Sequence, residues 1–252
     1  MSVLAVRGLS KSFGGVHAVR ELDFDVAEGE VVAMIGPNGA GKTTCFNMIG
    51  GQLLPDAGSI IFRERQLAGL GARRIWRLGV GRTFQLTQPF ASMTVRGNVQ
   101  AALISDHGRT HSVFAKANTL FAAQADALLG RVRLEDQAEQ ACASLAYGDL
   151  KRLELAMALA NAPRLLLLDE PTAGVSASER QALMTLIADV VSEGRISVLF
   201  TEHDMDVVFG HATRVLVLHR GRLLAEGDPD TVRADTHVRE IYLGSGGASG
   251  RE

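Results

Sequence analysis

The sequence predicts an α/β fold with a largely parallel sheet, and three observations support that prediction. Residues 36–43 match a phosphate-binding loop, apolar strands alternate with helical segments between residues 164 and 218, and residues 94–160 carry few strand signals. Alternation favours parallel strands, because each helix returns the chain across one face of the sheet. The stretch 94–160 has apolar residues at helical spacing and no proline, so we expect a mostly helical insert there.

The phosphate-binding pattern G-x-x-x-x-G-K-S/T runs from Gly36 to Thr43. Its glycines let the backbone curl so that successive N–H groups point at phosphate oxygens. Lys42 supplies a positive charge for the β- and γ-phosphates, and the Thr43 hydroxyl suits Mg²⁺. An apolar strand at 31–35 enters the loop, and a helix at 44–49 leaves it with its N-terminus toward the anion. The predicted nucleotide-binding residues are Gly36, Pro37, Asn38, Gly39, Ala40, Gly41, Lys42, Thr43 and Thr44.

The remaining elements follow from alternation, apolar runs and turn residues. Before the insert, we expect strands at 3–7, 22–26, 59–62 and 79–85. After the insert, we expect a strand at 164–168, a helix at 177–192, a strand at 196–201, a helix at 203–210 and a strand at 213–218. Residues 245–252 are rich in Gly and Ser and are expected to form a flexible tail.

Composition and charge exclude several classes of protein. The formal net charge of −2 gives no electrostatic reason to expect a nucleic-acid partner. No apolar run reaches about 18 residues, so no membrane span is predicted, and the N-terminus lacks the long apolar region of a secretory signal. The two cysteines, Cys45 and Cys142, are expected to be small buried hydrophobes in a reducing compartment. These features indicate a cytoplasmic protein.

Further candidate catalytic residues follow apolar strands, at the sheet edge where ligands of parallel α/β folds bind. Asp169 is suited to hold Mg²⁺ through water, and Glu170 beside it to polarise an attacking water. The imidazole of His203 is suited to donate to a γ-phosphate, and Gln85 to hold a water or Mg²⁺. On their own, two acids at a strand end are more often solvated, a lone histidine is usually structural, and most glutamines lie at the surface. The phosphate-binding loop in the same chain favours the catalytic interpretation.

Together these stretches resemble the nucleotide-binding subunit of an ABC transporter. The resemblance covers essentially the whole chain and rests on the order of the motifs at residues 36–43, 82–85, 145–149, 165–170 and 201–204. It implies a P-loop NTPase core with a mostly parallel sheet, an antiparallel β subdomain and an inserted helical subdomain. It identifies Gln85 with the glutamine loop and His203 with the switch histidine, and places Phe13 where an aromatic ring stacks on adenine, although Phe13 also suits the core. The signature motif, which faces the nucleotide of a partner subunit, is Leu145, Ala146, Tyr147, Gly148 and Asp149.

The resemblance also implies a mechanism that uses ATP and Mg²⁺. Two subunits clasp two ATP molecules head to tail, and ATP binding closes the dimer that hydrolysis reopens. Glu170 is the implied general base, Lys42 stabilises the developing charge, and His203 holds the γ-phosphate in line. The implied metal ligands are Thr43, Gln85 and Asp169.

The same resemblance implies the organisation of the chain and its partners. Residues 1–252 form a single ABC ATPase domain, with a catalytic core at 1–85 and 161–244 and a helical subdomain at 86–160. The partners are a second ATP-binding subunit in a homodimer or heterodimer, membrane permease subunits and, indirectly, an extracytoplasmic solute-binding protein. The protein is then expected to be peripheral, at the cytoplasmic face of the inner membrane.

Details of several motifs are similar to the ATP-binding subunits of branched-chain amino acid importers. The stretches concerned are residues 82–85, 89–95, 145–148, 202–205 and 241–244. Subunits of urea or amide importers and of lipopolysaccharide exporters share much of this pattern and remain alternatives. A soluble ABC ATPase outside transport is a further alternative, although such proteins usually carry two cassettes or a long coiled coil. A small-molecule kinase or GTPase would need no signature motif.

The sequence departs from the common family pattern at several positions. Ala146 stands where the Leu-Ser-Gly-Gly-Gln signature has serine, so backbone N–H groups at Gly148 and the helix N-terminus would have to contact the γ-phosphate. Tyr147 is usual for the subfamily, whereas Asp149 is not. Ser176 replaces an aspartate that links the two sites. A non-hydrolysing subunit therefore stays an alternative, against which the intact catalytic residues argue.

Overall fold

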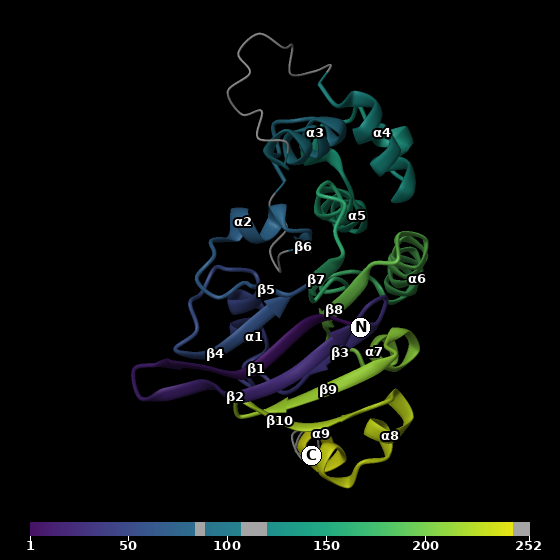
Figure 1. Ribbon diagram of the computed structural model, residues 1–252. Helices are drawn as coiled ribbons and strands as arrows, with labels where there is room; N and C mark the ends of the chain where they lie inside the picture. The colour runs from purple at the N-terminus through teal and green to yellow at the C-terminus, as the bar shows by residue number, and fades with distance from the viewer. Residues whose placement is uncertain (84–88, 107–119, 244–252) are drawn as a thin grey trace. The chain divides into compact units, whose positions relative to one another are not determined.

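The computed structural model describes residues 1–83, 89–106 and 120–243 (Figure 1). The chain divides into two compact units, Met1–Ala72 with Ser197–Glu252, and Arg73–Ile196. These two units differ from the predicted division into a catalytic core, at 1–85 and 161–244, and a helical subdomain at 86–160. The predicted division of the ABC ATPase domain remains a prediction. Gln85 and the tail 245–252 lie outside the described residues.

An antiparallel sheet opens the first unit, in the strand order β2-β1-β4-β5. Its strands are β1 (Ser2–Phe13), β2 (Val16–Ala27), β4 (Ala57–Phe62) and β5 (Arg65–Gln66). Alternate residues such as Val6, Phe24 and Phe62 are buried, which is the pattern of a sheet with one face toward a core. The strands β1 and β2 run side by side over most of their length in Figure 1, as their register from Ser2↔Ala27 to Phe13↔Val16 requires. The antiparallel β subdomain is thereby confirmed.

The same unit holds a second group of strands, in which β3 pairs in parallel with β8 on one side and β9 on the other. These strands are β3 (Val31–Ile35), β8 (Ser197–Thr201), β9 (Arg214–His219) and the antiparallel β10 (Arg222–Gly227). Its helices are α1 (Lys42–Ile49), α7 (Met205–His211), α8 (Pro229–Ala234) and α9 (Thr236–Leu243). Strand β3 is almost entirely buried, as expected of a central parallel strand with an apolar sequence.

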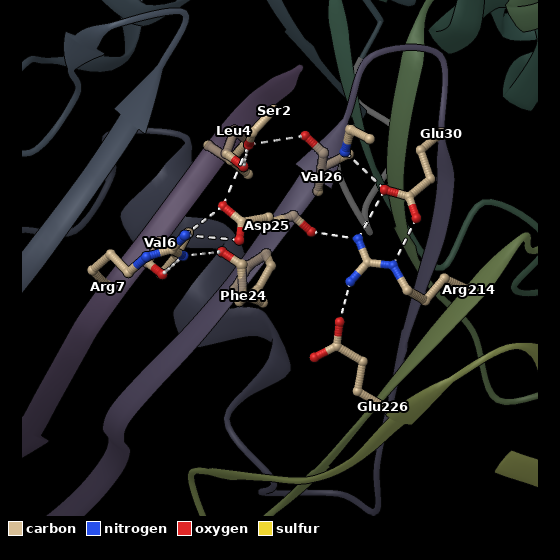
Figure 2. A network of polar contacts seen from close by, with 11 residues as sticks. Ser2, Leu4, Val6, Arg7, Phe24, Asp25, Val26, Glu30, Arg214 and Glu226 are labelled. Atoms are coloured by element: carbon tan, nitrogen blue, oxygen red, sulfur yellow. Dashed lines mark hydrogen bonds and ion pairs between the residues drawn. The ribbon is translucent and has the colours of Figure 1, made fainter.

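A polar network ties the strands of this unit together at one end (Figure 2). Arg214 on β9 donates through Nε and Nη2 to the two carboxylate oxygens of Glu30, at 2.6 and 2.8 Å. Its Nη2 also donates to the carbonyl of Asp25 at 2.6 Å, and its Nη1 pairs with Glu226 on β10. The Asp25 side chain in turn pairs with Arg7 on β1 at 2.7 Å. Bidentate arginine–carboxylate geometry of this kind fixes orientation as well as charge.

The second unit pairs β6 (Val80–Arg82) in parallel with β7 (Leu165–Asp169). Its helices are α2 (Ala72–Arg77), which begins at the unit boundary, α3 (Val95–Asp106), α4 (Ala122–Arg131), α5 (Tyr147–Ala158) and α6 (Ala177–Gly194). Short 3₁₀ helices, η2 (Glu135–Gln137) and η3 (Cys142–Ser144), precede α5. The described part of the stretch 94–160 is thus mostly helical, as predicted.

Several predicted element boundaries differ from the observed ones, and at two helices the N-terminal residue explains the difference. Helix α7 begins at Met205 rather than at residue 203, because the Asp204 carboxylate accepts from the N–H groups of Asp206 and Val207 as an N-cap. Helix α1 begins at Lys42, directly after the left-handed Gly41. Strand β6 is shorter than the predicted 79–85.

Two sequence-based expectations concern single residues and membrane spans. Cys45 and Cys142 are both buried and unbridged, as predicted, and burial raises the pKa of the Cys45 thiol to about 12. A thiol with that pKa stays protonated and behaves as a small hydrophobe. Among the described residues, no helix has the length and apolar character needed to cross a bilayer.

Candidate functional site

The phosphate-binding loop connects the buried strand β3 to helix α1, as the sequence predicts. A Cβ on Gly36 would lie 2.3 Å from the carbonyl oxygen of Leu218 on β9, and one on Gly41 would lie 2.4 Å from that of Ala18 on β2. Both glycines also have positive φ angles, 156° and 106°. The two glycines of the motif are therefore required by close backbone approach as well as by conformation.

Lys42 is the charged residue of this loop, and its side chain is only 7% exposed. Its Nζ donates to the carbonyl of Gly36 at 2.6 Å and of Pro37 at 3.4 Å, which holds the ammonium group across the loop. The following Thr43 is exposed in the first turn of α1. The first N–H groups of a helix have no intrahelical acceptor, so this turn combines N–H donors, an ammonium group and a hydroxyl. That combination suits a phosphate with a hydrated divalent cation.

Two further candidate residues lie in the same unit. Phe13, at the end of β1, has half of its surface exposed, with the Lys11 ammonium 5.7 Å from the ring centroid. This exposure excludes the core position that was the alternative for Phe13. His203 is exposed between β8 and α7, and its backbone N–H donates to the carboxylate of the buried Glu202 at 3.2 Å.

The second unit carries the paired acids at the end of β7. Asp169 is 3% exposed, and its Oδ2 lies 3.6 Å from Nη2 of Arg82, the last residue of β6. Burial lowers the pKa of the Arg82 guanidinium, and Asp169 opposes that shift. This ion pair was not predicted, because the sequence alone does not show that residues 80–82 and 165–169 form neighbouring strands.

Glu170 has an unusual backbone conformation for a residue other than glycine. Its φ angle is 49°, in the left-handed region, and its carbonyl accepts from Ala173 N–H at 3.1 Å in the turn that follows β7. Left-handed geometry at a non-glycine residue costs free energy and clusters at functional sites. Glu170 follows Asp169 directly and is half-buried.

The signature residues lie where the chain enters helix α5. Ala146 is the N-cap with extended geometry, and Tyr147 is the first helical residue. The first N–H groups of a helix have no intrahelical acceptor, so this turn offers N–H donors. Asp149 lies in the same turn and pairs with Arg152 at 3.5 Å.

Ser176 has a structural role in addition to its place in the family pattern. It is the N-cap of α6: its hydroxyl donates to Oε2 of Glu179 at 2.5 Å and accepts from the Glu179 N–H at 3.4 Å. The spacing S-x-x-E is the sequence signal of a capping box, and it was visible in the sequence. Serine and aspartate are equally good N-caps, so the replacement of aspartate preserves the start of the helix.

The residues present fit a nucleotide-bound Mg²⁺. Among the described residues, no three His, Cys, Asp or Glu side chains gather as a metal site. Mg²⁺ in phosphate-transferring sites typically takes only one or two protein ligands and completes its shell with phosphate oxygens and water. Within the first unit, the exposed hydroxyl of Thr43 offers a hard oxygen atom of that kind.

Comparison with protein families gives two matches. The family described as ABC transporter matches residues 19–173, which is more than half of the chain. The family described as Branched-chain amino acid ATP-binding cassette transporter matches residues 222–248.

Individual proteins match over nearly the full length. The high-affinity branched-chain amino acid transport ATP-binding protein LivG of Salmonella typhimurium is 40% identical and is aligned over 96% of this chain and 98% of its own. The lipopolysaccharide export system ATP-binding protein LptB of Acidithiobacillus ferridurans is 35% identical, over 96% and 97%. A crystal structure of the ADP conformation of an ATP-binding cassette of an ABC transporter has a TM-score of 0.87 and 28% identity, over 97% of this chain and 99% of that one.

Proposed function

Because the chain belongs to the ATP-binding subunits of ABC transporters, we propose that its ATPase activity drives the import of branched-chain amino acids. The observation that carries this proposal is the match of residues 222–248 to the branched-chain amino acid family, in a segment separate from the ATPase motifs. The 40% identity to LivG over nearly the whole chain supports it. We further propose a peripheral position at the cytoplasmic face of the membrane, since the transporter needs permease subunits to carry the solute.

We assign the chemistry of hydrolysis to the residues of the sequence motifs. The phosphate loop and the first turn of α1 bind the β- and γ-phosphates, and the Lys42 ammonium offsets their charge. Glu170 accepts the proton of the attacking water, and His203 donates to the γ-phosphate. Thr43, Asp169 and Gln85 would hold Mg²⁺, which would neutralise phosphate charge. Phe13 stacks on the adenine ring.

We propose that the active protein is a dimer of cassettes, either two copies of this chain or this chain with a related subunit. The signature residues of one chain then contact the nucleotide that the other chain binds, through the N–H groups at the start of α5. ATP closes the dimer, and hydrolysis opens it.

Two variants test the site. Lys42→Ala should weaken ATP binding, measured by titration with a fluorescent ATP analogue; unchanged affinity would contradict the role of the loop. Glu170→Gln should keep ATP binding and lower the hydrolysis rate by about 10²–10⁴-fold, because it removes the general base. A Glu170→Gln variant with the wild-type rate would remove Glu170 from the mechanism.

Uptake measurements test the transported solute. In the organism that carries the gene, its deletion should abolish uptake of labelled leucine, isoleucine and valine, and the wild-type gene but not Glu170→Gln should restore it. Loss of urea uptake instead, or a defect in lipopolysaccharide export, would replace the proposed solute with one of the alternatives. Intact uptake of all these solutes would favour an ABC ATPase outside transport.

A further inference from the structure

The exposed side chain of Tyr147 packs against Gly174, a residue distant in the sequence. A Cβ built on Gly174 would lie 2.9 Å from Cε1, 3.2 Å from Cζ and 3.3 Å from Oη of Tyr147. The edge of the ring thus occupies the space in which any other residue at position 174 would place its side chain. Both residues belong to the second unit, Tyr147 at the start of α5 and Gly174 in the loop before α6.

The ring of Tyr147 also lies near a cation of its own helix. The buried Lys151 places its ammonium 5.7 Å from the centroid of the Tyr147 ring, within the range of a cation–π interaction. The same ammonium pairs with the carboxylate of Glu154 at 3.2 Å. The ring thus contacts both a charged residue of its own helix and the loop at Gly174, although 45% of the surface of Tyr147 remains exposed.

The loop that contains Gly174 follows directly after Glu170, the candidate general base. Ala173 N–H donates to the carbonyl of Glu170 at 3.1 Å, and Val175 N–H donates to that of Thr172 at 3.1 Å. Two consecutive turns thus connect Glu170 to Gly174, which has a φ angle of +78°. A displacement of Gly174 would be transmitted through these turns to Glu170, because short hydrogen-bonded turns have few alternative arrangements.

We propose that Tyr147 is a positioning residue that couples the signature turn to the Glu170 loop of the same chain through its contact with Gly174. The inference rests on the proposed function, in which the signature contacts the nucleotide of the partner subunit while Glu170 serves the nucleotide of its own. A shift of α5 toward the partner nucleotide then moves the ring and, with it, the turns that hold Glu170. This path uses no side chain at position 176, where the aspartate common in the family is replaced by Ser176.

The test compares two glycines with nearly the same backbone conformation. Gly174→Ala introduces a Cβ against the Tyr147 ring, whereas Gly29→Ala places one at φ +75° with no described atom within 4 Å. Both variants carry the same kind of backbone strain, so their difference reports the contact with the ring. We expect Gly174→Ala to lower kcat for ATP hydrolysis by about 10–100-fold relative to Gly29→Ala, with ATP affinity unchanged.

A double-mutant cycle then identifies the ring as the cause. Tyr147→Ala should itself lower kcat, and Tyr147→Phe, which keeps the ring, should retain it. In the Tyr147→Ala background, Gly174→Ala should cost no more than Gly29→Ala does. Equal kcat for Gly174→Ala and Gly29→Ala, or effects of Gly174→Ala and Tyr147→Ala that simply multiply, would overturn the coupling. Thermal unfolding of each variant, with a melting temperature near that of the wild type, verifies that the rates refer to folded protein.

A parallel variant separates this inference from the function on which it rests. Gly148→Asp introduces a carboxylate into the signature turn, where Gly148 has room for a Cβ, with Glu179 Oε1 at 3.7 Å. It should abolish hydrolysis if the signature contacts a phosphate. Full hydrolysis by Gly148→Asp would overturn both the signature role and the coupling. Abolished hydrolysis in Gly148→Asp with equal rates for Gly174→Ala and Gly29→Ala would overturn the coupling alone.

Discussion

Arg82 and Asp169 form an ion pair between the ends of two parallel strands, with Nη2 and Oδ2 3.6 Å apart. The Arg82 side chain is 9% exposed and the Asp169 side chain 4%. A nearly buried carboxylate is costly to leave without a cation beside it, and carboxylate oxygens are among the hard ligands that Mg²⁺ prefers. The pair therefore connects the stability of the β6–β7 unit to the metal-binding role proposed for Asp169.

We expect Arg82→Met to destabilise the protein by about 3 kcal/mol, because it removes the cation beside a buried carboxylate. Arg133→Met is the matched control: Arg133 lies 3.4 Å from Asp189, but both side chains are more than half exposed. An exposed pair contributes at most about 1 kcal/mol. Urea unfolding of the two variants measures the difference. Equal losses of stability would show that burial does not determine the value of the Arg82 pair.

Prediction of this fold from the sequence succeeded where the pattern is local and repeated. The apolar run 31–35, the phosphate loop and the helical spacing of 94–160 each specify their element through neighbouring residues. The Arg82–Asp169 pair and the Tyr147–Gly174 contact join residues 87 and 27 positions apart, and no periodicity in the sequence encodes such pairs. The N-cap roles of Asp204 and Ser176 follow from local sequence spacing. They were not predicted, because both residues lie beside motifs that were interpreted only in terms of nucleotide binding.

Because Gly41 lies close to the backbone of β2, alanine at position 41 should destabilise the protein more than alanine at position 39 of the same loop. Gly41→Ala should destabilise the protein by about 1–3 kcal/mol more than Gly39→Ala, because its Cβ would lie 2.4 Å from the Ala18 carbonyl oxygen. Gly39 has a φ angle of +79° but no described atom within 4 Å of its Cβ, so it reports backbone strain alone. Thermal unfolding in the absence of nucleotide measures both. A Gly39→Ala variant as unstable as Gly41→Ala would mean that conformation, not packing, selects these glycines.

The Arg214 network predicts a dependence of stability on acid. Partial burial alone would raise the pKa of Glu30, but hydrogen bonds from Arg214 and from the Ala27 N–H outweigh it and hold the pKa below its ordinary value of 4.5. A carboxyl group with a lowered pKa in the folded state stabilises the protein above its unfolded pKa, and this contribution is lost as the pH falls through the folded value.

Glu30→Gln should accordingly lower the melting temperature at pH 7, and the difference from the wild type should shrink as the pH falls below 4.5. Melting curves from pH 7 to pH 3 measure this. Glu64→Gln is a suitable control, because Glu64 is exposed and lies outside the network of Figure 2. A difference between Glu30→Gln and the wild type that stays constant over this range would exclude titration of Glu30 as its source.

Ser176 offers the last prediction, because its N-cap role and the role of the aspartate common in the family can be separated. Ser176→Ala should cost about 1 kcal/mol of stability, since the start of α6 loses its side-chain acceptor, whereas Ser176→Asp should keep the wild-type stability. Ser192→Ala, near the other end of the same helix, should be neutral or slightly stabilising, because alanine is the better helix former. Urea unfolding measures all three variants. If Ser176→Asp were as unstable as Ser176→Ala, the N-cap would not explain why a serine suffices at this position.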